Sequence, residues 1–221
     1  MKLIIGNKNY SSWSMRGWLA AKQSGLNFEE IIVPMFGEEW QQKKLSEDSG
    51  MMPSHGRVRI LWDEDNVVWD SLAILEYLSD KVGRDRFWPK DESARGMARA
   101  IVAEMHSSFA SLRRELPMNV RRRVALENVS DETKQDIVRV LQLWAEARSR
   151  HGSSGPFLFG TYGAADIFYV PVVSRFITYG IGVPGFAQAY MEAMWEHEWT
   201  QEWITASEDE EWVIEQYETV S

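Results

Sequence analysis

The chain has 221 residues, of which 44% are hydrophobic and 26% charged, a composition typical of a folded globular protein and unlike that of disordered or fibrous chains. Its formal net charge of −9 argues against nucleic acid or an anionic membrane as a general partner. Because the sequence has no cysteine, disulfides, thiolate metal sites and a cysteine nucleophile are excluded, and any thiol chemistry must use a bound thiol.

The N-terminal residues predict a strand, a helix and a second strand. Residues 2–5 are apolar and strand-forming, and the helix that follows has Ser12 or Ser14 as its expected N-cap and Gly25 at its end. Residues 28–33 are again strongly strand-forming. Such a unit requires parallel strands joined by a crossover helix, which packs on one face of the sheet.

Residues 55–78 predict a β-hairpin followed directly by a helix. Strand-forming residues flank a polar turn at residues 63–66, and apolar residues then recur at helical spacing. Asp70 and Ser71 lie at the join, where Ser71 either caps the helix or holds an anionic ligand group against its N-terminus. Between the second strand and the hairpin, residues 38–45 predict a short, irregular helix.

The remainder of the chain predicts helices only. Three longer helices are expected over residues 93–116, 131–148 and 164–179, the last of them apolar on nearly all sides and containing Pro171. Ser130 is the expected cap of the second helix, and two or three short helices follow Pro184. We therefore expect an α/β domain at residues 1–82, a linker at 83–92 and an all-helical domain at 93–221.

Three motifs in this order resemble those of the glutathione transferase superfamily, and most of all its serine-type, bacterial and zeta-like members. They are NYSSWSMRGWLA at residues 9–20, VVWDSLAILEYL at residues 67–78 and FGTYGAADIFYVPVVSRF at residues 159–176. The resemblance covers essentially the whole chain. It implies a thioredoxin-like N-terminal domain of β-α-β-α-β-β-α order, followed by an all-helical domain that binds the electrophile.

The resemblance places the reacting thiol of glutathione beside the serine loop. Conjugation needs the thiolate, and a hydroxyl donor together with helix N-terminal N–H groups lowers the pKa of a thiol. Ser11, Ser12 and Ser14 are the candidate catalytic residues, and Ser11 matches the position of the zeta-like serine. Three hydroxyls in a row also suit a turn and a helix cap, so both interpretations stay open. Arg16 lies one turn into the helix, where it is either an electrostatic aid or simply solvated.

The resemblance implies that glutathione is also held by the hairpin and its helix. Ser71 would bind the γ-glutamyl carboxylate and Asp70 would face the amino group, with Val58 and Arg57 completing the site. The family has a cis-proline after this valine, whereas this chain has Arg59. A cis bond without proline costs about 2.5–4 kcal/mol, so we expect a trans bond and an altered presentation of Val58.

A second departure from the family is Gly163, which stands where a serine or threonine normally caps the buried helix. Glycine caps a helix acceptably but has no side-chain acceptor. Asp166, three residues later, is therefore expected to form only half of a capping box.

The electrophile pocket implied by the resemblance is lined by Trp13, Met105, His106 and Phe109. For His106 a purely structural role is the alternative. The four histidines show no metal-ligand spacing, so no metal is expected and glutathione is the only expected cofactor, as a co-substrate.

Taken together, the residues and the resemblance predict a detoxifying glutathione transferase that adds glutathione to a small apolar electrophile, or uses it to isomerise one. The alternative is a non-catalytic protein of the same fold that binds or regulates a partner, suggested by Arg59. The resemblance implies a homodimer. No apolar run reaches membrane-spanning length and the N-terminus lacks the apolar core of a secretory signal, so a cytoplasmic location and no membrane or nucleic-acid partner are expected.

Overall fold

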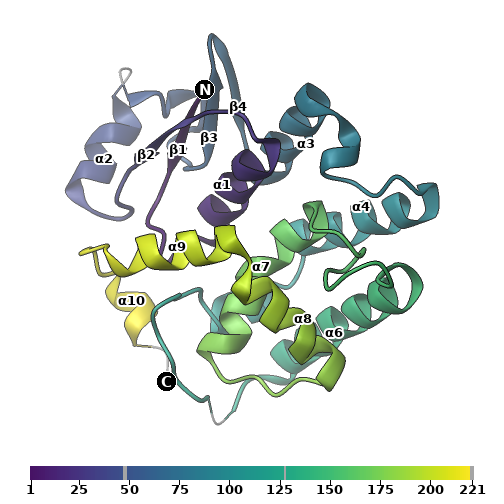
Figure 1. Ribbon diagram of the computed structural model, residues 1–221. Coiled ribbons are helices and arrows are strands. Elements are labelled where there is room, and N and C mark those ends of the chain that lie inside the picture. The colour runs from purple at the N-terminus through teal and green to yellow at the C-terminus, as the bar shows by residue number, and fades with distance from the viewer. Residues whose placement is uncertain (47–48, 127, 220–221) are drawn as a thin grey trace.

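The computed structural model describes residues 1–46, 49–126 and 128–219, which form a small sheet with its helices and a larger helical region beside it (Figure 1). The sheet has the strand order β2-β1-β3-β4. Its strands are β1 (Lys2–Ile5), β2 (Glu29–Ile32), β3 (Ile60–Asp63) and β4 (Asn66–Trp69). β1 pairs in parallel with β2 and antiparallel with β3, as expected for a crossover unit followed by a hairpin.

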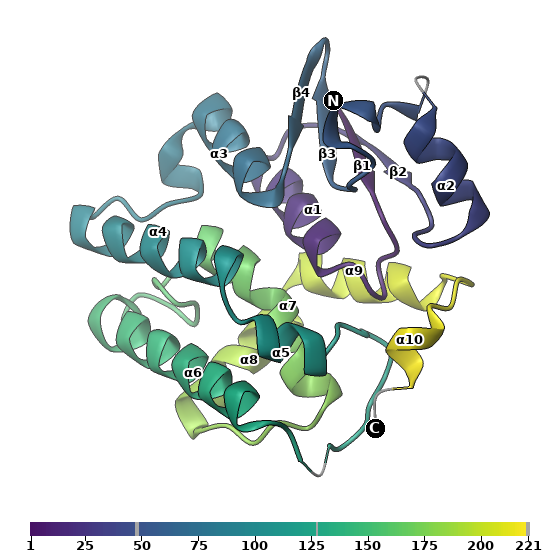
Figure 2. The same ribbon diagram turned by 180° about the vertical axis from the view of Figure 1, so that it is seen from behind.

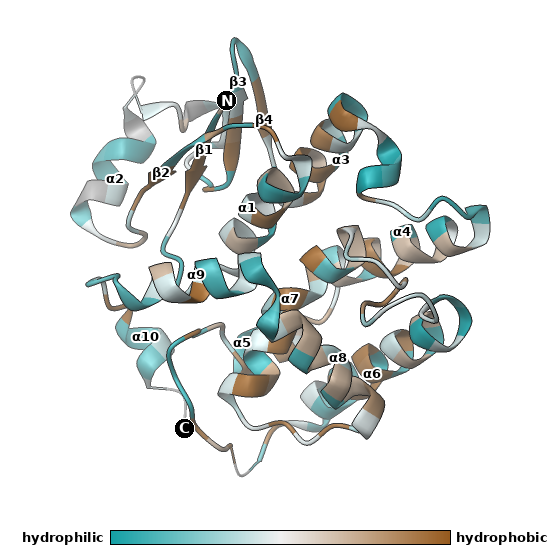
Figure 3. Cartoon of the chain, in the orientation of Figure 1, coloured by the Kyte–Doolittle hydropathy of each residue, from teal (hydrophilic) through white to brown (hydrophobic). Residues whose placement is uncertain are grey.

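The two faces of the sheet are covered differently. Alternation along β1 places Leu3 and Ile5 in the main core, whereas Ile4 faces a second, smaller cluster with Val33 and Met51. α1 (Ser12–Ser24) and α3 (Ser71–Val82) pack against each other on the side of the main core, and α2 (Glu38–Leu45) lies apart from them (Figures 1 and 2). In Figure 3 the strands are hydrophobic over part of their length only, because β2 begins with Glu29 and Glu30 and β4 with Asn66.

The helical region is built around one central helix. Its helices are α4 (Glu92–Ser107), α5 (Ala110–Glu115), α6 (Asp131–His151), α7 (Ala164–Thr178), α8 (Gly185–Glu196), α9 (Glu198–Glu208) and α10 (Glu215–Glu218). All residues of α7 except Ile177 are buried, which agrees with its apolar sequence. α7 packs against α4, α8 and also α1, so it joins the helical region to the sheet. Short 3₁₀ turns cover Met52–Ser54 and Arg84–Arg86.

The predicted fold class is confirmed, but several local predictions are wrong. The predicted helix over 93–116 is interrupted, because Ser108 is extended and Phe109 adopts a left-handed conformation with φ of 61°. Ser11, rather than Ser12 or Ser14, caps α1, and Asp70, rather than Ser71, caps α3. No helix in the described ranges is long and apolar enough to cross a membrane.

Candidate active site

The N-cap and first turn of α1 hold three serines, Ser11, Ser12 and Ser14, which differ in their hydrogen bonds. The Ser11 hydroxyl accepts the Ser14 N–H at 3.2 Å and donates to Ser14 Oγ at 2.8 Å. Ser14 Oγ in turn accepts the Gly6 N–H at 2.9 Å and is fully buried. Ser12 Oγ accepts from Arg175 Nη2 at 3.3 Å, and its own hydrogen has no acceptor among the described residues. Ser12 therefore has the hydroxyl that is free to donate to a ligand.

A pocket of about 270 Å³ lies beside the serine loop. It is lined by Tyr10, Ser11, Ser12, Trp13, Met35, Phe36, Arg113, Pro117, Met118, Arg175 and Tyr217. These residues come from the start of α1, the loop after β2, the end of α5, α7 and the C-terminal segment, so the pocket lies between the sheet region and the helical region. Its walls combine apolar side chains with hydroxyl and guanidinium donors.

Trp13 is surrounded by positive charge. The guanidinium carbons of Arg16, Arg59 and Arg113 lie 4.8, 4.6 and 4.7 Å from centroids of its rings. Cations are attracted to the face of an indole, which provides part of the stabilisation that these guanidiniums need. His106 contacts Trp13 edge-on at 5.3 Å between centroids.

The arginines around the pocket are held by neutral groups. Arg16 is only 1% exposed, donates from Nε to the Phe168 carbonyl at 3.0 Å, and leaves Nη1 and Nη2 unpartnered. Arg113 donates to the carbonyls of Met105 and His106. Burial and then the charge of Arg113 lower the pKa of Arg16. A buried charge without a counter-ion is costly, so this cluster favours an anionic guest.

Arg175 completes the cluster from α7. It donates to the carbonyls of Leu116 and Pro171 at 2.7 and 2.9 Å as well as to Ser12. Burial, followed by repulsion from Arg113, lowers the pKa of Arg175 to about 9. It thus remains charged at neutral pH and faces the pocket.

At the start of α3, Arg59 binds the capping aspartate. Arg59 Nη2 lies 2.8 Å from Asp70 Oδ2, while Asp70 Oδ1 accepts the Leu72 N–H at 2.9 Å and lies 3.4 Å from His106 Nε2. Burial opposes ionisation of Asp70, but the bonds from Arg59 and Leu72 outweigh it and lower the pKa of Asp70. Burial also lowers the pKa of His106, and nearby arginines lower it further against the opposing effect of Asp70.

The Val58–Arg59 bond is trans, since no cis peptide occurs among the described residues. Arg59 has φ of 69° and its N–H donates to the Ile4 carbonyl at 3.0 Å. Its side chain therefore leaves the strand towards Trp13 and Asp70. The sequence-based expectation of a trans bond agrees with this geometry.

The structure brings some predicted site residues together and separates others. Ser11, Ser12 and Trp13 line the pocket. His106 does not line it but contacts the ring of Trp13 and lies 3.4 Å from Asp70. Asp70 in turn pairs with Arg59, whose guanidinium lies over the ring of Trp13. The remaining predicted residues do not line the pocket.

Those remaining residues have varied surroundings. Val58 is buried in the second cluster of the sheet and Arg57 is exposed. Ser71 is fully buried with an unpartnered hydroxyl, and Met105 and Phe109 pack in the main core. Their roles stay predictions.

Sequence reasoning did not single out Arg113 or Arg175 of the pocket wall, nor Met35, Phe36 and Tyr217. Arg113 lies in an ordinary helical sequence, and Arg175 lies within the quoted motif at residues 159–176 without any local signal that it faces a pocket. The described residues contain no group of three or more acidic or histidine side chains that could hold a metal ion.

Comparison with known proteins gives consistent matches. Residues 10–81 match the family model described as the N-terminal domain of glutathione S-transferase. Protein IN2-1 homolog B from Oryza sativa, in its indica and japonica subspecies, is 22% identical over 181 residues, which are 79% of this chain. The match spans 65% of the length of those curated relatives.

Solved structures resemble nearly the whole chain. A glutathione transferase homolog from Burkholderia with bound glutathione has a TM-score of 0.69 and 21% identity, covering 95% of this chain and 98% of its own. A theta class enzyme from Xanthomonas axonopodis with glutathione bound scores 0.65 at 20% identity, covering 92% and 96%. A maleylacetoacetate isomerase from Methylobacterium extorquens with bound malonate and glutathione scores 0.65 at 18% identity, covering 94% and 97%. At these identities the likeness shows the fold.

Proposed function

We propose that this protein is a glutathione transferase. The chain has the fold of the glutathione transferase superfamily, and residues 10–81 match the N-terminal domain of that family. It binds glutathione with the thiol beside the serine loop and transfers the thiolate to a small electrophile. The neighbours that hold glutathione support this proposal.

The observation that carries the proposal is the donor set around the free hydroxyl of Ser12. Ser12 lies at the N-terminus of α1 and lines the pocket together with Arg113 and Arg175. A hydroxyl donor, a helix N-terminus and two guanidiniums each favour a thiolate over a thiol and so lower the pKa of a bound thiol. Of the three candidate serines, Ser12 is therefore the one we assign to the thiolate.

The acceptor is a small molecule with an apolar body. Trp13, Met35, Phe36 and Met118 supply apolar walls on which an electrophilic carbon can lie close to the sulfur. Addition or substitution leaves glutathione attached to the product, whereas isomerisation would release it again. We extend the proposal to a cytoplasmic, detoxifying homodimer, as the resemblance implies.

We expect Ser12→Ala to lower kcat/KM for a chloro-dinitro arene by about 10- to 100-fold, because a hydrogen bond to a charged group is lost. The pKa of the bound thiol, followed by thiolate absorbance, should rise in parallel. Ser11→Ala should instead lower the free energy of unfolding by about 1 kcal/mol, because Ser11 is the N-cap of α1, and affect kcat/KM less.

Ser174→Ala is the matched control, since Ser174 is a buried serine of α7 outside the pocket. It should leave the thiol pKa unchanged. Equal activity of wild type and Ser12→Ala would contradict the assignment, and no binding of glutathione at millimolar concentration would contradict the proposed function.

A second candidate function is a non-catalytic binding protein of the same fold. The ion pair of Arg59 with Asp70 favours it, because it occupies the carboxylate that the resemblance assigns to the amino group of glutathione. The two candidates differ in turnover: a non-catalytic protein shows no conjugation above the uncatalysed rate, with any of several electrophiles.

A further inference from the structure

A second cavity, the outer groove, lies next to the pocket beside the serine loop. It has a volume of about 480 Å³ and lies between residues 34–37, which follow β2, and residues 212–216, which lead into α10. Met35 and Phe36 line both cavities, and Tyr217, which directly follows the second segment, lines the pocket beside the serine loop. The same two segments therefore bound both cavities, so a molecule that extends outward from the pocket between these segments enters the outer groove.

The outer groove has an exposed apolar surface. Phe36, Trp212 and Val213 are 60%, 42% and 57% exposed and are three of the six large apolar side chains that are exposed in the described ranges. Phe36 also has a φ of 68°, a left-handed conformation that bulky residues rarely adopt. Strain of this kind persists only where the surrounding structure fixes the residue, and it gathers at functional sites. Exposed apolar surface gathered in a groove is typical of a place where an apolar ligand binds.

Both walls of the outer groove are fixed to the loop that carries the serines. Figures 1 and 2 show the connection between α9 and α10 beside the loop between β2 and α2. On the side of β2, the Met35 N–H donates to Asn7 Oδ1 at 2.8 Å. On the C-terminal side, Ile214 is buried, and Glu218 Oε1 accepts from the Tyr10 hydroxyl at 2.6 Å. The outer groove is therefore formed before a ligand enters, which lowers the entropy cost of binding.

The outer groove carries little charge, in contrast to the pocket beside the serine loop. Among its described lining residues Glu215 is the charged one, and it is exposed. The pocket instead has the guanidiniums of Arg113 and Arg175 in its wall. A carboxylate in the outer groove would lose hydration without gaining a cation, and Glu215 would repel it. The outer groove therefore favours a neutral, apolar group.

We propose that the outer groove holds an apolar tail of the acceptor while the electrophilic group lies beside Ser12. The preferred acceptors are elongated molecules, with a reactive end and an uncharged end that packs between Phe36 and Trp212. Trp212 is thus a specificity-determining residue for the proposed reaction. The inference rests on the proposed function and adds the class of acceptor.

Three acceptors with the same reactive ring test the proposal. They are amides of chloro-dinitrobenzoic acid that carry an ethyl, a hexyl or a carboxypentyl group on the amide nitrogen, at the ring position opposite the chlorine. In each, the sulfur of glutathione forms a bond to the ring carbon, chloride leaves with the bonding electron pair and the thiol proton passes to solvent. Because the tails are remote from the reacting carbon, the uncatalysed rates are nearly equal and differences in kcat/KM report how each tail binds.

We expect kcat/KM of the wild type to be about tenfold higher for the hexyl amide than for the ethyl amide. The difference should lie in a lower KM, since each buried methylene strengthens binding of the ground state and the transition state alike. The carboxypentyl amide, which has as many tail carbons as the hexyl amide, should be about tenfold worse than it. Its carboxylate would have to lose water near Glu215.

Trp212→Ala should lower the hexyl-to-ethyl ratio of kcat/KM from about tenfold to about twofold, because the ring that packs on the tail is removed. Phe186→Ala is the matched control. Phe186 is another exposed aromatic residue, 39% exposed in α8, and it lines neither cavity. This variant should keep the ratio of the wild type.

Val213→Asp provides a second variant if Trp212→Ala folds poorly. Val213 is largely exposed, so an aspartate there is compatible with the fold, while its charge in the outer groove should also lower the hexyl-to-ethyl ratio. Equal kcat/KM of the wild type for the ethyl and hexyl amides, or an unchanged ratio in both variants, would overturn the inference while the proposed function stands.

Two further outcomes separate the inference from its rivals. A lower molar mass of Trp212→Ala in light scattering, together with an unchanged ratio, would show that a second copy of the chain covers the outer groove, and the inference would be wrong. Turnover of the unsubstituted chloro-dinitro arene but of none of the amides would also overturn it. If the wild type conjugates neither the arene nor any amide, the proposed function fails and the inference with it.

Discussion

Asp166 shows how one buried carboxylate organises the start of α7. Its Oδ1 accepts the Leu158 N–H and the Tyr190 hydroxyl, both at 3.1 Å, and its Oδ2 accepts the Gly163 N–H at 3.0 Å. The bond to Gly163 is the half of a capping box that the sequence predicts. Three donors and a helix N-terminus favour the carboxylate, but complete burial outweighs them and raises the pKa of Asp166 to about 7.

This raised pKa predicts a pH dependence of stability with a definite sign. An unfolded aspartate titrates near pH 3.9, so between about pH 4 and pH 7 the folded state holds a proton that the unfolded state releases. The contribution of Asp166 is therefore full below about pH 4 and is lost as the pH rises to about 7. The difference corresponds to at most about 4 kcal/mol.

Asp166→Asn does not titrate, so its free energy of unfolding should fall less between pH 4.5 and pH 7.5 than that of wild type, measured by urea unfolding. Only the slope is compared, because the amide also changes the hydrogen bonds. Asp131→Asn, at an exposed position in the first turn of α6, should keep the slope of the wild type. An identical slope in Asp166→Asn would contradict the prediction.

At the scale of single elements, the spacing of apolar residues predicts most strands and helices. It does not predict the exact position of a helix break or a helix cap, which depends on backbone conformation. The strands and helices occur where apolar spacing places them, including α7, whose residues are apolar on nearly all sides. Apolar spacing does not predict the break between α4 and α5, because Phe109 continues the spacing of Met105 and Leu112 across the break. The predicted caps of α1 and α3 are also wrong, because the observed caps, Ser11 and Asp70, lie one to three residues before the predicted ones. Serine and aspartate both cap helices well, so residue type does not decide between neighbouring polar residues.

Ser130 is a cap that the sequence predicts correctly, and it also joins two helices. Its hydroxyl accepts the Thr133 N–H at 3.1 Å and donates to Glu115 Oε1 at 2.7 Å, while its N–H donates to Glu115 Oε2 at 2.9 Å. One serine thus fixes the start of α6 against the end of α5. The two residues of this pair are 15 positions apart in the sequence.

We expect Ser130→Ala to lower the free energy of unfolding by about 1 kcal/mol, the usual cost of losing a cap. The comparison is Ser149→Ala in the last turns of the same helix, where the hydroxyl is exposed and donates to the Glu146 carbonyl. That change should have almost no effect, because alanine is the better helix former. Equal losses in urea unfolding would show that the cap and its link to Glu115 contribute little.

At the scale of the whole molecule, the site is assembled from segments far apart in the sequence. Arg16, Arg59, Arg113 and Arg175 lie on α1, before β3, on α5 and on α7, yet three of them surround one indole. Local patterns predicted the serine loop and Asp70, because those signals are contiguous. The convergence of the four arginines depends on how the helical region packs on the sheet, which no local pattern reports.

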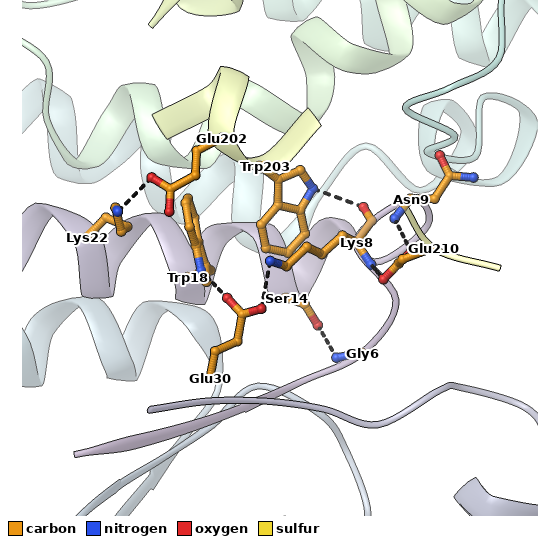
Figure 4. Close-up of polar contacts among 10 residues, drawn as sticks. All are labelled: Gly6, Lys8, Asn9, Ser14, Trp18, Lys22, Glu30, Glu202, Trp203 and Glu210. Atoms are coloured by element: carbon orange, nitrogen blue, oxygen red, sulfur yellow. Dashed lines mark hydrogen bonds and ion pairs between the residues drawn. The ribbon is translucent and has the colours of Figure 1, made fainter. Parts of the chain in front are cut away.

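The C-terminal segment fixes the serine loop from outside. Glu210, which follows α9, accepts the N–H groups of Lys8 and Asn9 at 2.6 and 2.9 Å, and Trp203 Nε1 donates to the Lys8 carbonyl at 2.9 Å (Figure 4). Further along, Glu218 accepts from the Tyr10 hydroxyl at 2.6 Å. The loop that carries Ser11 and Ser12 is therefore held by contacts about 200 residues away in sequence.

Glu210→Ala should leave the amides of Lys8 and Asn9 without acceptors in a buried position. We expect a loss of about 2 kcal/mol or more in the free energy of unfolding and faster hydrogen exchange at these two amides, measured by NMR. Glu202→Ala is the matched control, because Glu202 also links α9 to α1 through Lys22, but as a half-exposed ion pair. Such pairs contribute about 0–1 kcal/mol, so this variant should leave the exchange of the loop unchanged. Equal exchange in both variants would show that the loop keeps its conformation without the C-terminal segment.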